Sequence, residues 1–275
     1  MTDTVLSGGA TSPSPRSWQR FSAAERLSRF AVYLVLVAAL VWSVRTIEVI
    51  PEFLADSPQQ MKDLFVRMWP IAWSHYPKGV HDALIETLHI ATLGTILAII
   101  LAFPLGLLAA KNVTPVPFLN WASKLLLVAS RSVNSLVWAL LFVAILGPGA
   151  LAGTLAIAFR SIGFVGKLIG EALEEAQPGS IEALTATGAP AASIFTKGYW
   201  PQLEPSFWSI ALFRWDINVR ESAVLGLVGA GGIGMALDTA LNLFQWERVA
   251  VVLVAIFVVV VLAEIVVTQI RRRVL

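Results

Sequence analysis

Three arginines lie inside long apolar stretches of the sequence, where a charge is costly. Arg131, Arg160 and Arg214 each fall within a candidate membrane span. At about 1.5 Å per residue, each guanidinium is expected roughly 14–18 Å deep, near the middle of the bilayer. A charge at that depth costs at least about 2.5–3.5 kcal/mol, so each arginine needs a partner or a role. Because an arginine fork matches a tetrahedral oxyanion, these residues predict a path for an anionic solute.

The fifth candidate span carries polar groups on two faces. At helical spacing Arg214, Asn218 and Glu221 share one face, whereas Asp216 and Arg220 form an i, i+4 pair on nearly the opposite face. Such a helix must pack inside a bundle or line a water-filled path. Arginines outnumber acidic residues at this depth, so we expect surplus positive charge. The alternative is a set of structural interhelical salt bridges, for which Asp216–Arg220 is the best candidate. The predicted substrate path comprises Arg131, Asn134, Arg160, Arg214, Asn218, Arg220 and Glu221.

The start of the second span carries residue types that can bind a metal. Asp82, Glu86 and His89 share a helix face there, and His81 precedes them. Two histidines and two carboxylates could hold zinc, but His81 points away from that face. Acidic residues are favoured at a helix N-terminus, so we expect a polar helix start and no metal. The chain has no cysteine, which excludes thiolate ligands and cysteine nucleophiles.

The elements that position these residues are expected to be membrane helices. The chain is 57% hydrophobic and 14% charged, whereas soluble domains carry about 25% charged residues. The net charge of +2 does not indicate a nucleic-acid partner. Apolar runs of about 20 residues are long enough to cross a bilayer. The expected fold class is therefore all-α, a polytopic membrane protein with six transmembrane helices. The expected spans are 30–49, 83–110, 119–146, 150–173, 205–227 and 249–270.

Basic residues near the ends of the apolar runs set the expected orientation. Residues 1–28 are polar and rich in serine, proline and arginine, and we expect a cytoplasmic tail there, ahead of a transmembrane domain at 29–275. Basic residues concentrate on the cytoplasmic side of membrane proteins. Because six spans return the chain to its starting side, both termini are expected in the cytoplasm. The basic residues that flank the first and last spans are Arg16, Arg20, Arg26, Arg29, Arg271, Arg272 and Arg273.

The same orientation places residues 174–204 on the cytoplasmic side. A proline-glycine-serine turn predicts a helix start and Gly188 a helix end, so a short helix is expected at 181–187. A second short helix is expected at about 191–197, with Pro201 at the entrance of the fifth span. Two short helices around a glycine turn suit docking into a groove of another protein. The alternative is an ordinary connecting loop.

A glycine-rich segment at 228–246 is expected as a loop on the outer face. Its spacing of glycines matches Gly-x-Gly-x-x-Gly, but no strand precedes it, so it does not predict a dinucleotide site. Glycine tolerates backbone shapes that other residues resist, which favours a hinge or gate. A merely flexible loop is the alternative. The predicted gate residues are Gly229, Gly231, Gly232 and Gly234.

The cytoplasmic segment resembles the coupling loop of ABC-importer permeases. Glu182, Ala183, Gly188 and Pro201 stand at the spacing of that family's Glu-Ala-Ala…Gly…Ile-x-Leu-Pro pattern. The resemblance implies that these four residues sit in a cleft of an ATP-binding subunit and couple its ATPase activity to transport. The sequence departs from the pattern at Leu184, Gly198 and Trp200.

Two further stretches resemble the phosphonate-transport permeases in particular. One runs from Arg214-Trp-Asp-Ile-Asn through Gly234, and the other comprises Arg131-Ser-Val with Leu136-Val-Trp-Ala-Leu-Leu. The resemblance implies a type I ABC-importer permease in the bacterial inner membrane that carries phosphonate, phosphate or phosphite by alternating access. The implied partners are a second copy of the chain, two ATP-binding subunits and an extracytoplasmic substrate-binding protein.

The chain itself is expected to have no enzyme activity and no cofactor. It lacks a Gly-x-x-x-x-Gly-Lys-[Ser/Thr] motif, so ATP and Mg²⁺ are expected on the separate ATP-binding subunit. Two rival functions remain at this point. An ion-coupled secondary transporter of a small anion would use the membrane charges as relays. Inverted repeats and broken helices would favour that function, and the sequence shows no clear repeat. An intramembrane enzyme would need a deep nucleophile and base, and no histidine lies deep in a span.

Overall fold

The computed structural model describes residues 21–47 and 50–274, which form two units divided after Gln60. The first unit contains α1 (Ala23–Thr46) and the start of α2 (Pro51–Met68), which continues into the second. Ser22 caps α1: its side chain accepts a hydrogen bond from the Glu25 backbone, and the Glu25 carboxylate accepts one from the Ser22 N–H. This capping box explains why α1 begins well before residue 30, the start predicted for the first span.

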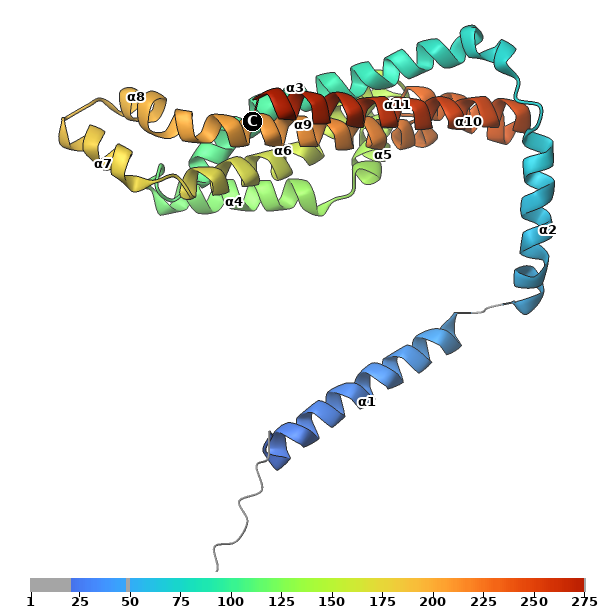
Figure 1. Cartoon of the computed structure of the whole chain (residues 1–275), viewed down its shortest axis with the longest axis horizontal. Coiled ribbons are helices and arrows are strands. Elements are labelled where there is room, and N and C mark those ends of the chain that lie inside the picture. Colours follow the sequence, from blue (N-terminus) through green and yellow to red (C-terminus); the bar gives the residue numbers. More distant parts are fainter. Residues whose placement is uncertain (1–20, 48–49, 275) are drawn as a thin grey trace, which may run out of the picture. The chain divides into compact units, whose positions relative to one another are not determined.

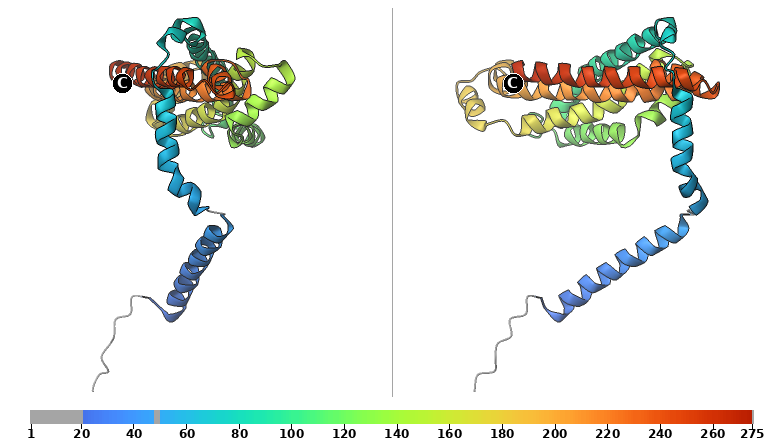
Figure 2. Two further views of the ribbon diagram at one scale, coloured as in Figure 1. Left: turned by 90° about the vertical axis from the view of Figure 1, so that its right-hand side faces the viewer. Right: turned by 45° about the vertical axis from the view of Figure 1, so that its right-hand side comes forward.

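The second unit is a bundle of long helices (Figure 1). Two short helices, α7 and α8, lie together at one end of it, and α11 runs alongside α9 (Figures 1 and 2). The helices of this unit are α3 (His81–Ala109), α4 (Pro117–Ser132), α5 (Ser135–Leu146), α6 (Ala150–Glu174), α7 (Pro178–Ala186), α8 (Ala191–Ile194), α9 (Trp200–Leu225), α10 (Ile233–Asn242) and α11 (Trp246–Val274). Every regular element in the described ranges is helical, so the predicted all-α class is confirmed.

Helix α6 is the centre of the bundle and contacts α3, α4, α5 and α9. Small residues permit this close approach, as is usual in membrane helix packing. A Cβ atom added at Gly163 would lie 2.3 Å from the Leu127 carbonyl oxygen of α4, and one at Gly106 would lie 2.9 Å from the Gly166 oxygen. Alternating with these glycines, larger residues of α6 such as Ile169 are fully buried. The sequence of α6 therefore fixes how closely its neighbours approach.

The number of spans depends on two bent helix pairs. Among the described residues, α1, α3, α6 and α11 are each long and apolar enough to cross a membrane. The pair α4 and α5 is bent by 88°, and the pair formed by residues 191–228 and α10 is bent by 40°. Six spans result if each bent pair crosses the membrane once. The ends predicted for α3 and α6 agree with the structure within two residues.

One predicted span is wrong as a continuous helix. The run 119–146 is broken because Val133 and Asn134 adopt extended backbone, with ψ angles of 135° and 147°. The Asn134 side chain accepts a hydrogen bond from Leu136 N at 3.1 Å and so caps a new helix. Asparagine satisfies the free amide of α5 within an apolar run, which explains how the chain turns sharply without proline or glycine.

Two further boundaries are corrected by the structure. The fifth span begins at Trp200 rather than residue 205, because Pro201 occupies the first turn of α9, where a missing N–H costs nothing. The segment 228–246 is not a simple loop, since α10 occupies most of it. Between α9 and α11 the chain therefore forms a further short helix, α10, which packs against both of them.

Candidate functional site

Two arginines share one carboxylate inside the bundle. Arg160 of α6 forms an ion pair with Glu221 of α9, and Arg214 Nη2 lies 3.5 Å from the other oxygen of the same carboxylate. Arg214 and Glu221 stand two helical turns apart on one face of α9, which places both toward α6. Arg160 also lies 3.5 Å from the Ser135 hydroxyl at the start of α5. The three charged groups carry a net charge of +1, so the cluster can accept an anion.

Buried hydroxyl and amide groups hold Arg214 in place. Its Nε donates to Ser161 Oγ at 2.8 Å, and the same hydroxyl lies 3.2 Å from Asn218 Oδ1. Asn218 Nδ2 in turn donates to Thr95 Oγ1 of α3 at 2.8 Å. Arg214 is only 3% exposed, whereas the Arg160 side chain is 30% exposed. Arg214 is thus a fixed part of the bundle, and Arg160 is the arginine of this cluster that a solute can reach.

Two of the three deep arginines have an acidic partner, as the alternative of structural salt bridges predicts. Arg160 and Arg214 both pair with Glu221, one from another helix and one from the same helix. Arg131 does not join them, because α4 ends at Ser132 and its last turn faces another part of α6. Arg131 therefore lies apart from Arg160 and Arg214, and its place on the substrate path stays a prediction.

The remaining predicted path residues differ in their relation to the cluster. Asn134 caps α5, and its Oδ1 accepts a hydrogen bond at 3.2 Å from the Ser135 hydroxyl that Arg160 contacts, so it borders the cluster. Arg220 pairs with Asp216 and lies 4.0 Å from Glu264 of α11, on a different face of α9, as the helical spacing predicted for this pair. Ser161 and Thr95 also belong to the site, although no sequence pattern indicates them. Small hydroxyl residues are common in membrane helices, and only the packing of three helices shows that these two meet Arg214 and Asn218.

The coupling segment folds as two short helices joined at Gly188. Helix α7 ends in a backbone motif in which Gly188 has φ +74° and Ala189 N donates to Leu184 O at 3.2 Å. This is the glycine stop predicted from the sequence. The second helix is shorter than expected, since α8 ends at Ile194 and a π-helical turn follows at Phe195–Tyr199. Residues 195–197, which were expected in the second helix, belong to this wider turn, and α9 follows it directly at Trp200.

Helix α7 packs against the π-helical turn through its apolar edge. A Cβ atom added at Gly198 would lie 3.3 Å from Leu184 and 3.5 Å from Ile181, so the small residue at 198 makes room for α7. Glu182 and Ala183 lie on the exposed side, as does Pro201 at the start of α9. The apolar edge of α7 is therefore used inside the chain, and the Glu182 face is available to another protein.

One glutamine ties the coupling segment to α9. Gln202 accepts a hydrogen bond from Gln177 N at 2.8 Å and donates to Ser180 Oγ at 3.0 Å. It also donates to the Gly198 carbonyl at 2.8 Å. The start of α7 and the start of α9 are thus linked through a single side chain, and sequence reasoning gave no signal for it.

The glycine-rich segment is packed rather than loose. Gly231, Gly232 and Gly234 are buried, and Gly229, Gly231 and Gly232 have positive φ angles. Ile233 N donates to the Thr87 hydroxyl of α3 at 2.7 Å, which anchors the start of α10. The structure therefore disagrees with a merely flexible loop at this position. Among the residues described, no three histidine, aspartate or glutamate side chains form a metal-binding group.

Sequence comparison gives relatives over most of the chain. The transport system permease protein HtxC of Stutzerimonas stutzeri is 36% identical over 245 residues, which cover 86% of this chain and 84% of HtxC. The phosphite transport system permease protein PtxC of the same organism is 39% identical over 66% of both chains. The phosphate-import permease protein PhnE of Mycolicibacterium smegmatis is 34% identical over 86% of this chain, which spans 44% of PhnE.

Structural comparison gives the same fold. An amino acid ABC transporter, determined with histidines, superposes with a TM-score of 0.63 over 74% of this chain and 97% of that chain, at 18% identity. The inward-facing MetNI methionine ABC transporter superposes with a TM-score of 0.62 over 75% of this chain and 99% of that chain, at 23% identity. Residues 102–275 match the family described as binding-protein-dependent transport system inner membrane components. The chain therefore belongs to this family of multi-pass membrane permeases.

Proposed function

We propose that the chain is the membrane-spanning permease subunit of an ATP-driven importer for a phosphorus oxyanion, namely phosphonate, phosphate or phosphite. The observation that carries the proposal is the cluster in which Arg160 and Arg214 share Glu221. Its excess positive charge lies between α6 and α9, and its exposed member is a guanidinium that fits two oxygens of a tetrahedral anion. Two relatives, PtxC and PhnE, are named for transport of phosphite and of phosphate, which are phosphorus oxyanions.

Membership of the permease family favours this function over an ion-coupled secondary transporter. The proposed partners are a second copy of the chain, two ATP-binding subunits that bind ATP and Mg²⁺, and an extracytoplasmic substrate-binding protein. Both termini are assigned to the cytoplasmic side of a bacterial inner membrane. ATP hydrolysis is assigned to the separate subunits, and the glycine segment around Gly231 to a hinge or gate.

The coupling path is proposed to run from α7 to the polar cluster. The exposed Glu182 face of α7 docks on the ATP-binding subunit, and Gln202 joins α7 to the first turn of α9. Arg214 and Glu221 lie further along the same helix. Closure of the ATP-binding subunits would therefore move Arg214 and Glu221 of α9 relative to Arg160 of α6 and change the access of the anion.

The function is tested by assembling the chain with its ATP-binding and substrate-binding partners in liposomes. We expect ATP-dependent uptake of a phosphorus oxyanion, reduced by competing phosphonate, phosphate or phosphite and unaffected by a proton or sodium gradient. Uptake that follows an ion gradient without ATP would support the secondary transporter instead. Absence of binding to any ATP-binding subunit would contradict the permease assignment.

Replacing Arg160 by lysine is expected to slow uptake about 10-fold or more while leaving assembly intact. Lysine keeps the positive charge beside Glu221 but loses the fork that contacts two anion oxygens. The contact must remain weak in the native protein, because a solute that binds too tightly cannot leave. The measurement is the initial rate of uptake together with the melting temperature. Normal uptake by Arg160→Lys would remove Arg160 from the substrate path.

Replacing Gly188 by valine is expected to abolish ATP-driven uptake without loss of the folded permease. At φ +74° a side chain costs about 1–2 kcal/mol, so the end of α7 should change shape. An added Cβ meets no atom within 4 Å, so the defect should stay local. The measurement is stimulation of the ATP-binding subunit. The matched control is Gly179→Ala in the first turn of α7, where an added Cβ also meets nothing and no positive φ is required. Full uptake by Gly188→Val would contradict the proposal that α7 couples the ATP-binding subunit to transport.

A further inference from the structure

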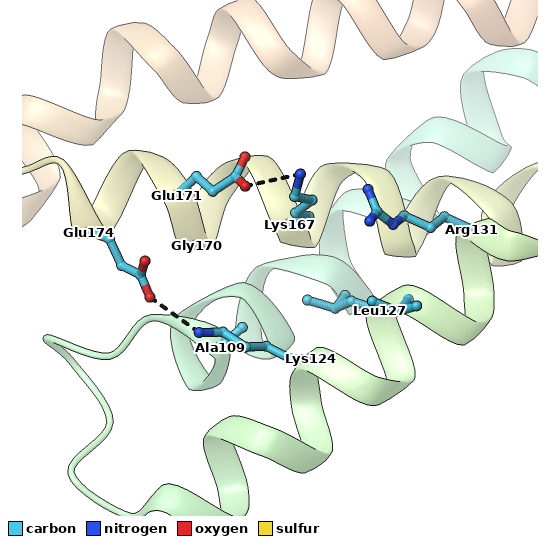
Figure 3. Close-up of a pocket in the computed structure, with 9 residues that line it drawn as sticks. Ala109, Lys124, Leu127, Arg131, Lys167, Gly170, Glu171 and Glu174 are labelled. Carbon is cyan, nitrogen blue, oxygen red and sulfur yellow. Dashed lines mark hydrogen bonds and ion pairs between the residues drawn. The ribbon is translucent and has the colours of Figure 1, made fainter. Parts of the chain in front are cut away.

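A second charged site lies between α4 and α6, apart from the Arg160 cluster. It is a pocket of about 160 Å³ (Figure 3), lined in part by Glu171 and Glu174 in the last turn of α6, shortly before α7 begins at Pro178. Helix α4 lines it with two apolar residues, Leu127 and Val128, between the charged Lys124 and Arg131. Helix α6 lines it with Lys167, Glu171 and Glu174. A pocket with charges on both helices cannot face lipid acyl chains, so it opens to water or to the headgroup region.

The charges in this pocket do not balance. Lys124 pairs with Glu174 at 3.4 Å, and Lys167 pairs with Glu171 at 3.0 Å. Arg131 has no ion pair with any residue in the described ranges. Figure 3 shows its guanidinium extending along α6 toward the Lys167 amine. Two cations directed at the same space, with one of them unpaired, leave room and charge for one anion.

The backbone of Arg131 is held firmly in this position. The neighbouring Ser130 hydroxyl bonds to the Phe159 carbonyl of α6 and accepts from Gly163 N at 3.2 Å. A Cβ atom added at Gly163 would lie 2.8 Å from Arg131 N, so the two helices touch there. The walls of the pocket are therefore set by close helix packing, and the Arg131 and Lys167 side chains that reach into it are solvent-exposed.

We propose that this pocket binds a phosphorus oxyanion through Arg131 and Lys167, with any organic group against Leu127 and Val128. The argument from charge and packing stands without the proposed function, which supplies only the class of anion. The same chemistry occurs in a transported oxyanion and in a phospholipid headgroup. Because the pocket lies beside the coupling end, its occupant is placed to leave toward, or arrive from, the cytoplasmic side.

The test uses a single introduced cysteine, since the natural chain has none. Val128 is 46% exposed and lines the pocket, so Val128→Cys places a thiol inside it. The full chain is purified in a maltoside detergent, and the rate of thiol modification is measured with a negatively charged methanethiosulfonate and with a neutral one. Inorganic phosphate is then added in one arm and short-chain phosphatidylglycerol in another. Sodium chloride at equal ionic strength controls for screening.

We expect phosphate to slow modification by both reagents, about tenfold at a concentration roughly ten times its Kd. Because the pocket carries surplus positive charge, the negatively charged reagent should also react faster than the neutral one. Adding Arg131→Gln or Lys167→Gln should remove both this difference in rate and the protection by phosphate. The matched control is Arg248→Gln at the start of α11, which should leave the protection by phosphate and the difference in rate between the two reagents unchanged. Protection by phosphate identifies a free oxyanion as ligand, and protection by phosphatidylglycerol alone identifies a headgroup.

The proposal is overturned if neither compound slows the reaction beyond sodium chloride, or if Arg131→Gln behaves as Arg248→Gln does. This readout does not depend on transport. Intact ATP-driven uptake by the assembled importer with no protection at Val128→Cys would remove this pocket as an anion site and leave the proposed function standing. Protection at Val128→Cys without ATP-driven uptake would support the anion site and contradict the proposed function.

Discussion

Replacing Glu221 by glutamine is expected to be the most destabilising single change in the polar cluster. Glu221 is the shared counterion of Arg160 and Arg214, and Arg214 is almost fully buried. Removing one partner of a buried ion pair costs about 3–5 kcal/mol, because the remaining charge loses its compensation. Glutamine is nearly isosteric, so the loss reports the charge rather than the packing.

The measurement is the melting temperature and the yield of the purified chain in detergent. We expect a clear fall in both for Glu221→Gln. The matched control is Glu264→Gln, because the Glu264 side chain is 67% exposed and only 4.0 Å from Arg220. An exposed pair contributes about 0–1 kcal/mol, so this control should melt close to the natural chain. Equal melting temperatures for the two variants would show that Glu221 does not hold the cluster together.

Replacing Gly231 or Gly232 by alanine is expected to lower both stability and uptake. Each has a positive φ angle, of 83° and 73° respectively, which costs a side chain about 1–2 kcal/mol. Each also lacks space: an added Cβ would lie 2.8 Å from the Ala150 backbone at position 231, and 2.5 Å from Thr87 Oγ1 at position 232. Overpacking of this kind adds about 1–3 kcal/mol.

A control separates the backbone effect from the packing effect. Gly147 has φ +85°, but a Cβ added there meets no atom within 4 Å. Gly147→Ala should therefore show the smaller, conformational loss alone. The measurements are melting temperature and initial uptake rate. If Gly232→Ala melts and transports as Gly147→Ala does, the contact of the glycine segment with α3 has no role in stability or gating.

The apolar pattern predicted the long helices because burial in lipid depends on composition over about 20 residues. It placed α3, α6 and α11 near their observed ends. It failed at Asn134, because a single capping side chain turns the helix by 88° without changing the apolar character of the run. The apolar pattern also failed to predict α10. Gly229 ends the helical turn that follows α9, and Gly232 lies only three residues later at the start of α10, so the glycines resemble a single loop in the sequence.

The candidate site was only partly predictable for a different reason. Helical spacing correctly grouped Arg214 with Asn218 and Glu221 on one face of α9. It could not show that Arg160 of another helix shares Glu221, nor that Arg131 belongs to a separate pocket. Those facts depend on how α4, α6 and α9 meet. The glycine stop of α7 is local chemistry, and the sequence was sufficient to predict it.

The hydrogen bonds of Gln202 have a thermodynamic consequence. They join α7 to the first turn of α9, and Arg214 lies about 18 Å further along that continuous helix. Coupling between two binding sites is reciprocal: a ligand that shifts one shifts the other by the same free energy. If an ATP-binding subunit moves the cluster through α9 as proposed, we expect its affinity for nucleotide to depend on whether an anion occupies Arg160. Under the proposed coupling, the two hydrogen bonds that transmit movement of the ATP-binding subunit to α9 also transmit the effect of a bound anion back to that subunit.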